Sequence, residues 1–198
     1  MRVSKEKAAE NREALLGAAG KLFRERGIDG VGVAEVAKAA GLTHGALYAH
    51  FPSKELLAAE ALSHGFAAKM DDLRAWSGDR ELTFADYAGA LFSTHMRDEV
   101  TRGCPLTASA SEAGRQGPAL SKRFTDAFEE EVALVADAID GPVTAQARRS
   151  LSLAAIAAHI GAIAVARAVA KHDPALSEAV LRATHDAITA AYAAREAT

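Results

Sequence analysis

The chain has 198 residues, which is enough for one hydrophobic core of ordinary size or for two smaller ones. Hydrophobic residues make up 49% and charged residues 25%, a balance that excludes a disordered chain and a polytopic membrane protein. A single cysteine excludes an intrachain disulfide, and no apolar stretch follows the charges of residues 1–7, so we expect a cytoplasmic protein without a secretory signal.

The charge of the chain is unevenly divided. The formal net charge is −3, yet residues 1–57 carry nine Lys or Arg against seven Asp or Glu, and the acidic surplus lies beyond them. A difference of this size arises readily by chance and is weak support by itself. It gains meaning only beside a motif that binds an acidic partner such as DNA.

The residue pattern predicts an all-α fold. Alanine is abundant, and no alternating run of β-branched and aromatic residues is long enough for a strand. Each of the five prolines stands beside a plausible helix start, where its fixed backbone angle is tolerated. These prolines are Pro52, Pro105, Pro118, Pro142 and Pro174.

The N-terminal part predicts a helix-turn-helix. A first helix runs from about Ser4 to Arg26 and stops at Gly27. Two short helices follow, over about 33–40 and 43–50, and Gly41 supplies the tight turn between them. Thr43 is placed to cap the second helix by accepting a hydrogen bond from the amide of residue 45 or 46. A short helix, a glycine turn and a second short helix form the helix-turn-helix pattern.

Residues 36–57, VAKAAGLTHGALYAHFPSKELL, resemble the signature of the TetR family of transcriptional regulators. The match is ungapped, and the run Tyr-x-His-Phe-x-Ser-Lys makes it specific; the resemblance covers about residues 10–65. Gly32 departs from the family, which often has Thr or Ser there as cap and phosphate contact. The resemblance implies an N-terminal three-helix DNA-binding domain over 1–52 and a helical effector-binding and dimerisation domain over 53–198.

The DNA contacts follow from the resemblance and from the chemistry of the second short helix. Its first turn, residues 43–45, points at base edges in the major groove, and His44 is the expected base reader. Tyr48, His50 and Lys54 are expected to contact phosphates. The alternative is that these polar side chains are merely solvated. The complete expected set is Val33, Thr43, His44, Gly45, Ala46, Tyr48, His50 and Lys54.

Apolar stripes beyond residue 53 indicate a small-molecule pocket. A long helix from Ser53, a helix opened by a capping box of Thr83 and Asp86, and a helix starting at Pro118 each carry one such stripe. For any single aromatic residue, plain core packing is the competing interpretation, but TetR-like regulators bind apolar or amphipathic effectors here. The expected lining is Phe66, Met70, Tyr87, Leu91, Phe92, His95, Cys104, Phe124, Phe128 and His159.

The segment 151–170 is apolar, but His159 interrupts it, Arg167 closes it, and it is richer in alanine than a membrane span. We therefore expect a buried helix with no membrane partner. In TetR-like proteins this helix and the last one, which starts at Asp173 and Pro174, form a four-helix homodimer interface. The expected interface residues are Ala154, Ala158, Ala162, Val165, Leu181, Ile188 and Tyr192.

No catalytic machinery is visible in the sequence. The seven histidines include no close metal-ligand pair, and neither a phosphate-binding loop nor a nucleophile elbow occurs, so we expect no enzyme, no metal and no cofactor. The partners expected are double-stranded operator DNA, a small-molecule effector and a second copy of the chain. A DNA-binding regulator without an effector is the alternative.

Cys104 leaves a further alternative open. Pro105 suits the first position of a helix, which places Cys104 at the N-cap, where aligned amides favour a thiolate. Some TetR-like regulators that sense electrophiles carry a Gly-Cys at a similar point. Cys104 is therefore either a reactive sensor or a small buried hydrophobic residue, and we favour the second interpretation because free cysteines are usually buried.

Overall fold

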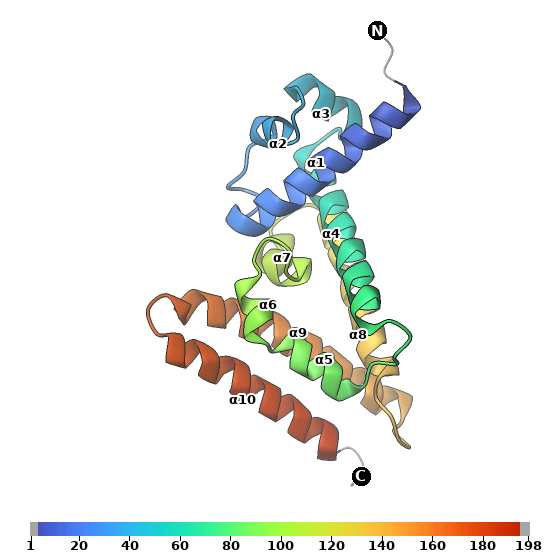
Figure 1. Ribbon diagram of the computed structural model, residues 1–198, viewed down its shortest axis with the longest axis vertical. Coiled ribbons are helices and arrows are strands. Elements are labelled where there is room, and N and C mark those ends of the chain that lie inside the picture. Colours follow the sequence, from blue (N-terminus) through green and yellow to red (C-terminus); the bar gives the residue numbers. More distant parts are fainter. Residues whose placement is uncertain (1–3, 195–198) are drawn as a thin grey trace. The chain divides into compact units, whose positions relative to one another are not determined.

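The computed structural model describes residues 4–194, and within this range it contains helices and no strand, as predicted (Figure 1). The helices are α1 (Lys5–Arg26), α2 (Val33–Ala39), α3 (His44–His50), α4 (Lys54–Ser77), α5 (Phe84–Leu91), α6 (Thr94–Asp98), α7 (Pro105–Ala113), α8 (Pro118–Asp137), α9 (Ala145–Ala170) and α10 (Pro174–Ala193).

The chain divides into two compact units. The first contains residues 1–71 and 104–125, and the second contains residues 72–103 and 126–198. Helices α4 and α8 each begin in the first unit and end in the second. This division differs from the expected boundary after residue 52, because α7 and the start of α8 pack with α1 and α4 although they are distant in sequence.

Helix ends in the first unit follow the predicted signals. The Ser4 side chain accepts a hydrogen bond from the amide of Lys7 and caps α1, and Gly27 ends the helix with a φ of +78°. Gly41, between α2 and α3, has a φ of +70°, a conformation that an L side chain rarely adopts. These two glycines fix where the chain turns.

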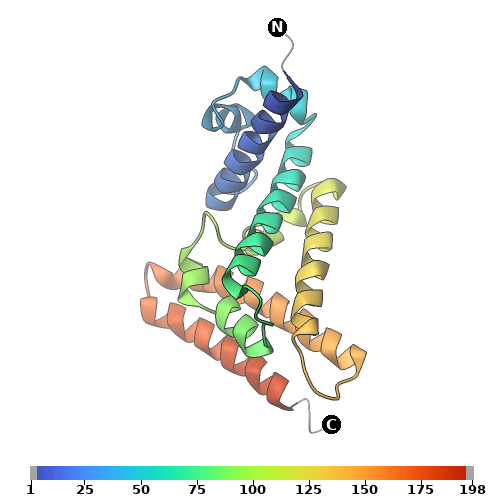
Figure 2. The same ribbon diagram turned by 45° about the vertical axis from the view of Figure 1, so that its right-hand side comes forward.

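The core of the first unit forms where α1 crosses the short helices and α4 (Figure 2). Fully buried apolar side chains come from each of these elements: Leu15 and Ala19 from α1, Val36 from α2, Leu47 from α3, Phe51 after α3, and Leu57 from α4. Polar groups also join α1 to α4. The Arg12 guanidinium lies over the Phe51 ring at 5.1 Å and forms an ion pair with Glu60, and His64 contacts Glu13 at 2.9 Å.

The second unit starts with α5, whose predicted capping box is confirmed. The Thr83 side chain accepts a hydrogen bond from the Asp86 amide, and the Asp86 carboxylate accepts one from the Thr83 amide. The helix ends after Leu91, and Ser93 then caps the separate short helix α6. This interruption changes the helical phase, so the apolar stripe of α5 does not continue into α6.

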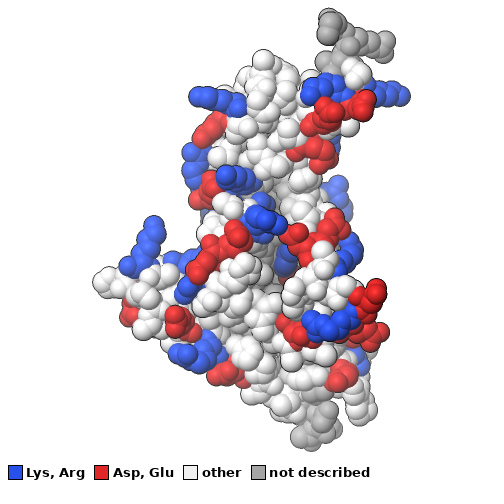
Figure 3. Space-filling model, in the orientation of Figure 1, with Lys and Arg blue, Asp and Glu red and all other residues white. Residues whose placement is uncertain are grey.

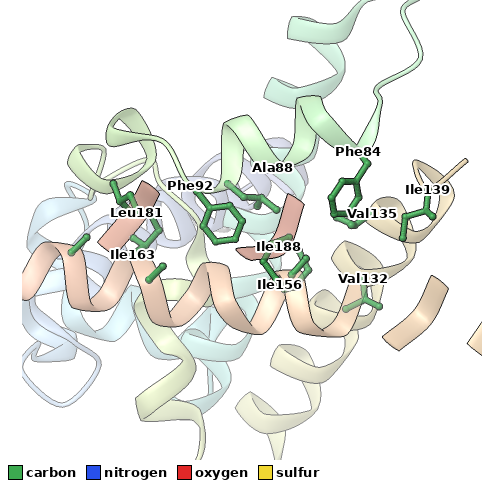
Figure 4. Close-up of a cluster of buried hydrophobic side chains, with 14 residues drawn as sticks. Phe84, Ala88, Phe92, Val132, Val135, Ile139, Ile156, Ile163, Leu181 and Ile188 are labelled. Atoms are coloured by element: carbon green, nitrogen blue, oxygen red, sulfur yellow. The ribbon is translucent and has the colours of Figure 1, made fainter. Parts of the chain in front are cut away.

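A continuous apolar cluster fills the second unit (Figure 4). Of its residues, Phe84 and Phe92 belong to α5 and its C-cap, Ile156 and Ile163 to α9, and Ile188 to α10. The Phe84 ring stacks on Tyr192 with centroids 4.2 Å apart, which joins the start of α5 to the end of α10. Helices α9 and α10 pack side by side along their length.

Helix α9 is long and apolar enough to span a membrane by length and composition alone, with a mean hydropathy of 1.9 over its most apolar stretch. It occupies the place of a core helix instead, packed against α10 and α6. Two of its fully buried residues, Ser152 and His159, are polar and hydrogen-bonded to backbone carbonyls. Arg167 near its end donates to the carbonyl of Arg97 at 2.7 Å and so helps to satisfy the end of α6.

Candidate nucleic-acid interface

The turn between α2 and α3 presents α3 as a rigid, exposed helix. Thr43 accepts a hydrogen bond from the Ala46 amide at 3.2 Å, and this amide is one of the two donors predicted from the sequence. On the inner side, Leu47 and Phe51 have no exposed surface. Gly32 caps α2 without any side-chain hydrogen bond, so the departure from the family pattern leaves the start of α2 without a hydroxyl.

The outer side of α3 carries the residues expected to contact DNA. Thr43, His44 and Gly45 are exposed at its first turn, and the Tyr48 side chain is 45% exposed one turn later. The His44 and Tyr48 rings meet edge to face with centroids 5.0 Å apart. The other expected members, Val33, Ala46, His50 and Lys54, are half-buried. The polar side chains expected to read bases therefore lie on a solvent-facing surface.

Charged groups flank this surface without forming one uniform basic patch. On the face shown in Figure 3, Lys and Arg side chains are interspersed with Asp and Glu. Arg26 of α1 donates to the Glu35 carboxylate of α2 at 2.6 Å, and this bond lowers the pKa of Glu35. The pair joins the end of α1 to the start of α2, a role that sequence spacing alone did not suggest.

An exposed, capped recognition helix that follows a glycine turn on a three-helix support defines a helix-turn-helix DNA-binding protein. Residues 15–61 match the model of the family described as "Bacterial regulatory proteins, tetR family". The HTH-type transcriptional repressor BepR of Brucella suis biovar 1 (strain 1330) is 50% identical over 54 residues, which cover 27% of this chain and 26% of BepR. The chain therefore matches BepR over about a quarter of the length of BepR.

Two solved structures share the fold over nearly the whole chain. A TetR family regulator from Cytophaga hutchinsonii superposes with a TM-score of 0.72 at 23% identity and covers 96% of this chain and 98% of its own. FadR from Bacillus subtilis, solved in complex with stearoyl-CoA, superposes with a TM-score of 0.62 at 14% identity. The match covers 86% of this chain and 96% of FadR. Residues 15–61 therefore resemble the DNA-binding part of the TetR family, and the chain as a whole shares the fold of solved TetR family regulators.

The residues expected to line an effector pocket are divided between the two units. Phe66, Met70, Cys104 and Phe124 belong to the first unit, and Tyr87, Leu91, Phe92, His95, Phe128 and His159 belong to the second. In the second unit, Leu91 and Phe92 are buried in the apolar cluster, with Tyr87 and Phe128 packed against it. His95 is exposed, contrary to the expectation that it ends an inward face, because α5 stops before it and α6 begins with a new phase.

His159 is the buried polar group of this set. It has no exposed surface, and its Nδ1 lies 2.7 Å from the carbonyl oxygen of Leu91. A carbonyl only accepts, so Nδ1 carries the proton and donates. The nearby Tyr87 hydroxyl has its pKa raised by burial and, further, by the carboxylates of Asp137 and Glu131. The second unit thus holds polar groups within an otherwise apolar interior.

The residues expected at a dimer interface fall into two groups. Ala162, Leu181 and Ile188 are buried in the chain's own apolar cluster, and Tyr192, which packs against that cluster, stacks on Phe84. A helix that is apolar on all sides does not reveal from its sequence which side faces its own domain. Ala154 and Val165 are exposed, Val165 by 49%, and Ala158 is half-buried.

Sequence reasoning missed two carboxylates of the first unit that bind backbone amides. Glu112, near the end of α7, accepts from the Ile28 amide, and Glu55, at the start of α4, accepts from the Ala119 amide. Each partner lies more than sixty residues away along the chain, and no local spacing signals such a contact. The unusual position of Glu112 in the last turn of a helix was the only available hint.

Proposed function

We propose that this protein is a cytoplasmic, non-enzymatic transcriptional repressor that binds a pseudopalindromic operator as a homodimer and leaves it when a small apolar or amphipathic effector binds. The observation that carries the proposal is the exposed first turn of α3, where His44 and Gly45 face solvent beside the Thr43 cap. Such a turn enters the major groove and reads base edges, while phosphate contacts from Tyr48, His50 and Lys54 hold the register. BepR, which is 50% identical to this chain over 54 residues, is named a repressor.

The dimer is supported by the exposed side of α9. Ala154, Ala157, Gly161, Ala164 and Val165 are exposed, while the other side of this apolar helix is buried in the second unit. Small residues allow two helix backbones to approach closely, so this surface suits a twofold contact with a second copy. A twofold dimer presents two recognition helices and selects an inverted repeat.

The effector part of the proposal is supported by the polar groups inside the second unit and by the shared fold, in which FadR was solved with stearoyl-CoA. An effector that binds the free dimer more tightly than the DNA-bound dimer lowers DNA affinity by the same factor, because the two equilibria are linked. Within the second unit, Tyr87 and His159 offer polar groups to such an effector, and Phe128 offers an apolar surface.

Selection of binding sites from a random duplex library tests the DNA part directly. The proposal predicts an inverted repeat whose half-sites are spaced by whole helical turns. Recovery of unrelated sequences, or of a single asymmetric site, would contradict it. Sedimentation of the Val165→Glu variant tests the dimer, because a like charge facing itself across a twofold axis raises the dimer dissociation constant by about a hundredfold. Glu130→Gln, on the exposed surface of α8, is the control.

Thermal stabilisation by members of a small-molecule library separates an effector-responsive repressor from a DNA-binding regulator without an effector. A ligand at a hundred times its dissociation constant stabilises the folded protein by about 2.7 kcal/mol, which a melting curve detects. A stabilising compound that also releases the selected duplex supports the proposed mechanism. A tight ligand that leaves DNA affinity unchanged removes the inducer model.

A further inference from the structure

The turn between α7 and α8 is attached to the helix-turn-helix by polar contacts that neither the family signature nor the proposed recognition mechanism uses. Three contacts join residues 112–119 to the N-terminal helices, all within the first unit. Glu112 accepts from the Ile28 amide, the Gln116 amide nitrogen donates to the Asp29 carboxylate at 2.9 Å, and the Ala119 amide donates to Glu55. We call these three contacts the amide clasp.

Glu112 holds the loop that leads into α2. Its two carboxylate oxygens lie 2.9 and 3.0 Å from the Ile28 nitrogen, and Ile28 itself is only 3% exposed. Gly27 has a φ of +78°, which favours glycine, and a Cβ there would stand 2.8 Å from Glu112 Oε1 and displace the carboxylate. A negative charge in the last turn of a helix is locally unfavourable, which indicates that the tertiary contact, rather than α7 itself, accounts for this residue.

Glu55 performs the matching role at the start of α8. The residue before this helix is Gly117, which has no side chain to act as a cap, and Glu55 Oε1 accepts from the Ala119 amide at 2.9 Å. A Cβ on Gly117 would lie 2.3 Å from Glu55 Oε1, so a side chain at this position would displace the carboxylate from the Ala119 amide. The oxygen that caps α8 therefore comes from α4, one residue after the expected phosphate contact Lys54.

A small cavity lies beside the amide clasp. Its volume is about 30 Å³, and it lies between α1, α4, α7 and the start of α8, lined by residues that include Phe23, Arg24, Leu62, Ser109 and Glu112. This volume has room for about two water molecules.

We infer that Glu112 and Glu55 are positioning residues for DNA binding: they fix the loop before α2 and the start of α8 to the helix-turn-helix, and thereby set the placement of α2 and α3. The inference deepens the proposed function by naming the contacts through which α7 and α8 act on the DNA-binding helices. Glu112 supports the loop from which α2 starts, and α2 positions α3 through their shared turn. Loss of this support loosens α2 and α3 before it affects the core of α4.

Hydrogen–deuterium exchange on the full-length protein tests the inference without any DNA. Glu112→Ala is expected to speed exchange of the Ile28 amide by at least about tenfold, as loss of a hydrogen bond to a charged group predicts. The increase should extend through α2 and leave the amides of residues 57–62 in α4 unchanged. Glu112→Gln keeps an oxygen acceptor and should restore most of the protection, whereas Glu112→Asp keeps the charge but shortens the reach and should resemble alanine.

The matched control is Glu130→Ala, which removes an exposed carboxylate from α8 and should leave all these rates unchanged. Unchanged exchange at Ile28, equal acceleration in every helix of the first unit, or failure of glutamine to restore protection would each overturn the inference. If Glu112→Ala does not fold, the comparison of the Gln and Asp variants gives the same decision.

Binding to the duplex selected by the wild-type protein supplies the functional readout. Glu112→Ala should weaken binding by about tenfold, with glutamine restoring most of the affinity and the preferred sequence unchanged. An affinity equal to that of wild type, together with accelerated exchange, would contradict a role in DNA binding. If selection recovers no duplex, the proposed function fails, while the exchange experiment still decides whether the amide clasp holds α2.

Discussion

The two units hold their helices together in different ways. In the first, several contacts between distant segments are polar, such as the bonds from Glu112 and Glu55 to backbone amides, and a cavity lies beside them. In the second, a continuous apolar cluster joins α5, α8, α9 and α10. Polar bonds can be broken one at a time, whereas an apolar cluster loses contacts throughout when one large member is removed. The first unit also has an apolar core, with Leu15, Leu47 and Phe51 fully buried. The difference therefore lies in its loops, where the bonds from Glu112 and Glu55 can open singly, whereas the cluster of the second unit responds as a whole.

Truncation of the apolar cluster should have the largest effect on stability. Ile156 has no exposed surface, and replacing a buried isoleucine by alanine removes its contacts and leaves a cavity. We expect Ile156→Ala to lower the free energy of unfolding by about 2–5 kcal/mol in urea denaturation. Gln146→Ala, at an exposed position of the same helix, should change it by no more than about 0.5 kcal/mol. Similar effects for the two variants would show that the cluster does not dominate the second unit.

The reactivity of Cys104 distinguishes packing from thiol sensing. The residue is the N-cap of α7, as predicted, but it is only 1% exposed, which favours the packing interpretation. We expect a maleimide to label the native protein at least about a hundredfold more slowly than the urea-unfolded chain, because the reagent reaches the thiol only after local opening. Operator binding should be equally insensitive in wild type and Cys104→Ser. Rapid native labelling that abolishes binding only in wild type would establish a sensor.

Removal of the α5 capping box should give the smallest effect. Thr83→Ala removes the hydroxyl that accepts from the Asp86 amide, and the expected loss is about 1 kcal/mol in thermal denaturation. Hydrogen bonds from the Thr83 amide, from Arg80 and from the Thr83 hydroxyl lower the pKa of Asp86 to about 2. Because the folded pKa lies below the unfolded value, this stabilisation is complete above pH 4 and disappears as the pH falls through about 2.

Asp86→Asn is the matched variant for this pH dependence. It removes the ionisable group, so the part of the melting-temperature decrease between pH 4 and pH 2 that belongs to the capping box should be absent. A melting temperature that falls equally in wild type and Asp86→Asn would show that other carboxylates account for the acid sensitivity.

Local features of both units were predictable from the sequence, and contacts between distant segments were not. Ser4, Thr43 and the Thr83–Asp86 box were identified as caps because a cap depends on residues within one helical turn. The interruption between α5 and α6 was missed, and with it the exposure of His95, because the apolar stripe alone does not show that Ser93 starts a new helix. Partners such as Glu112 and Ile28 depend on tertiary placement, which one sequence without an alignment does not reveal.

Binding of wild type, His44→Ala and Lys54→Ala to variants of the selected duplex shows whether the exposed first turn of α3 reads DNA sequence. His44→Ala should relax the preference at one base pair in each half-site. Changing that base pair should cost wild type about 1–3 kcal/mol of binding free energy and should cost His44→Ala much less. Lys54→Ala should weaken binding to all duplexes alike and reduce the salt slope by about 1. If His44→Ala keeps the wild-type preference at every base pair, α3 does not read the operator through this residue and the account is contradicted.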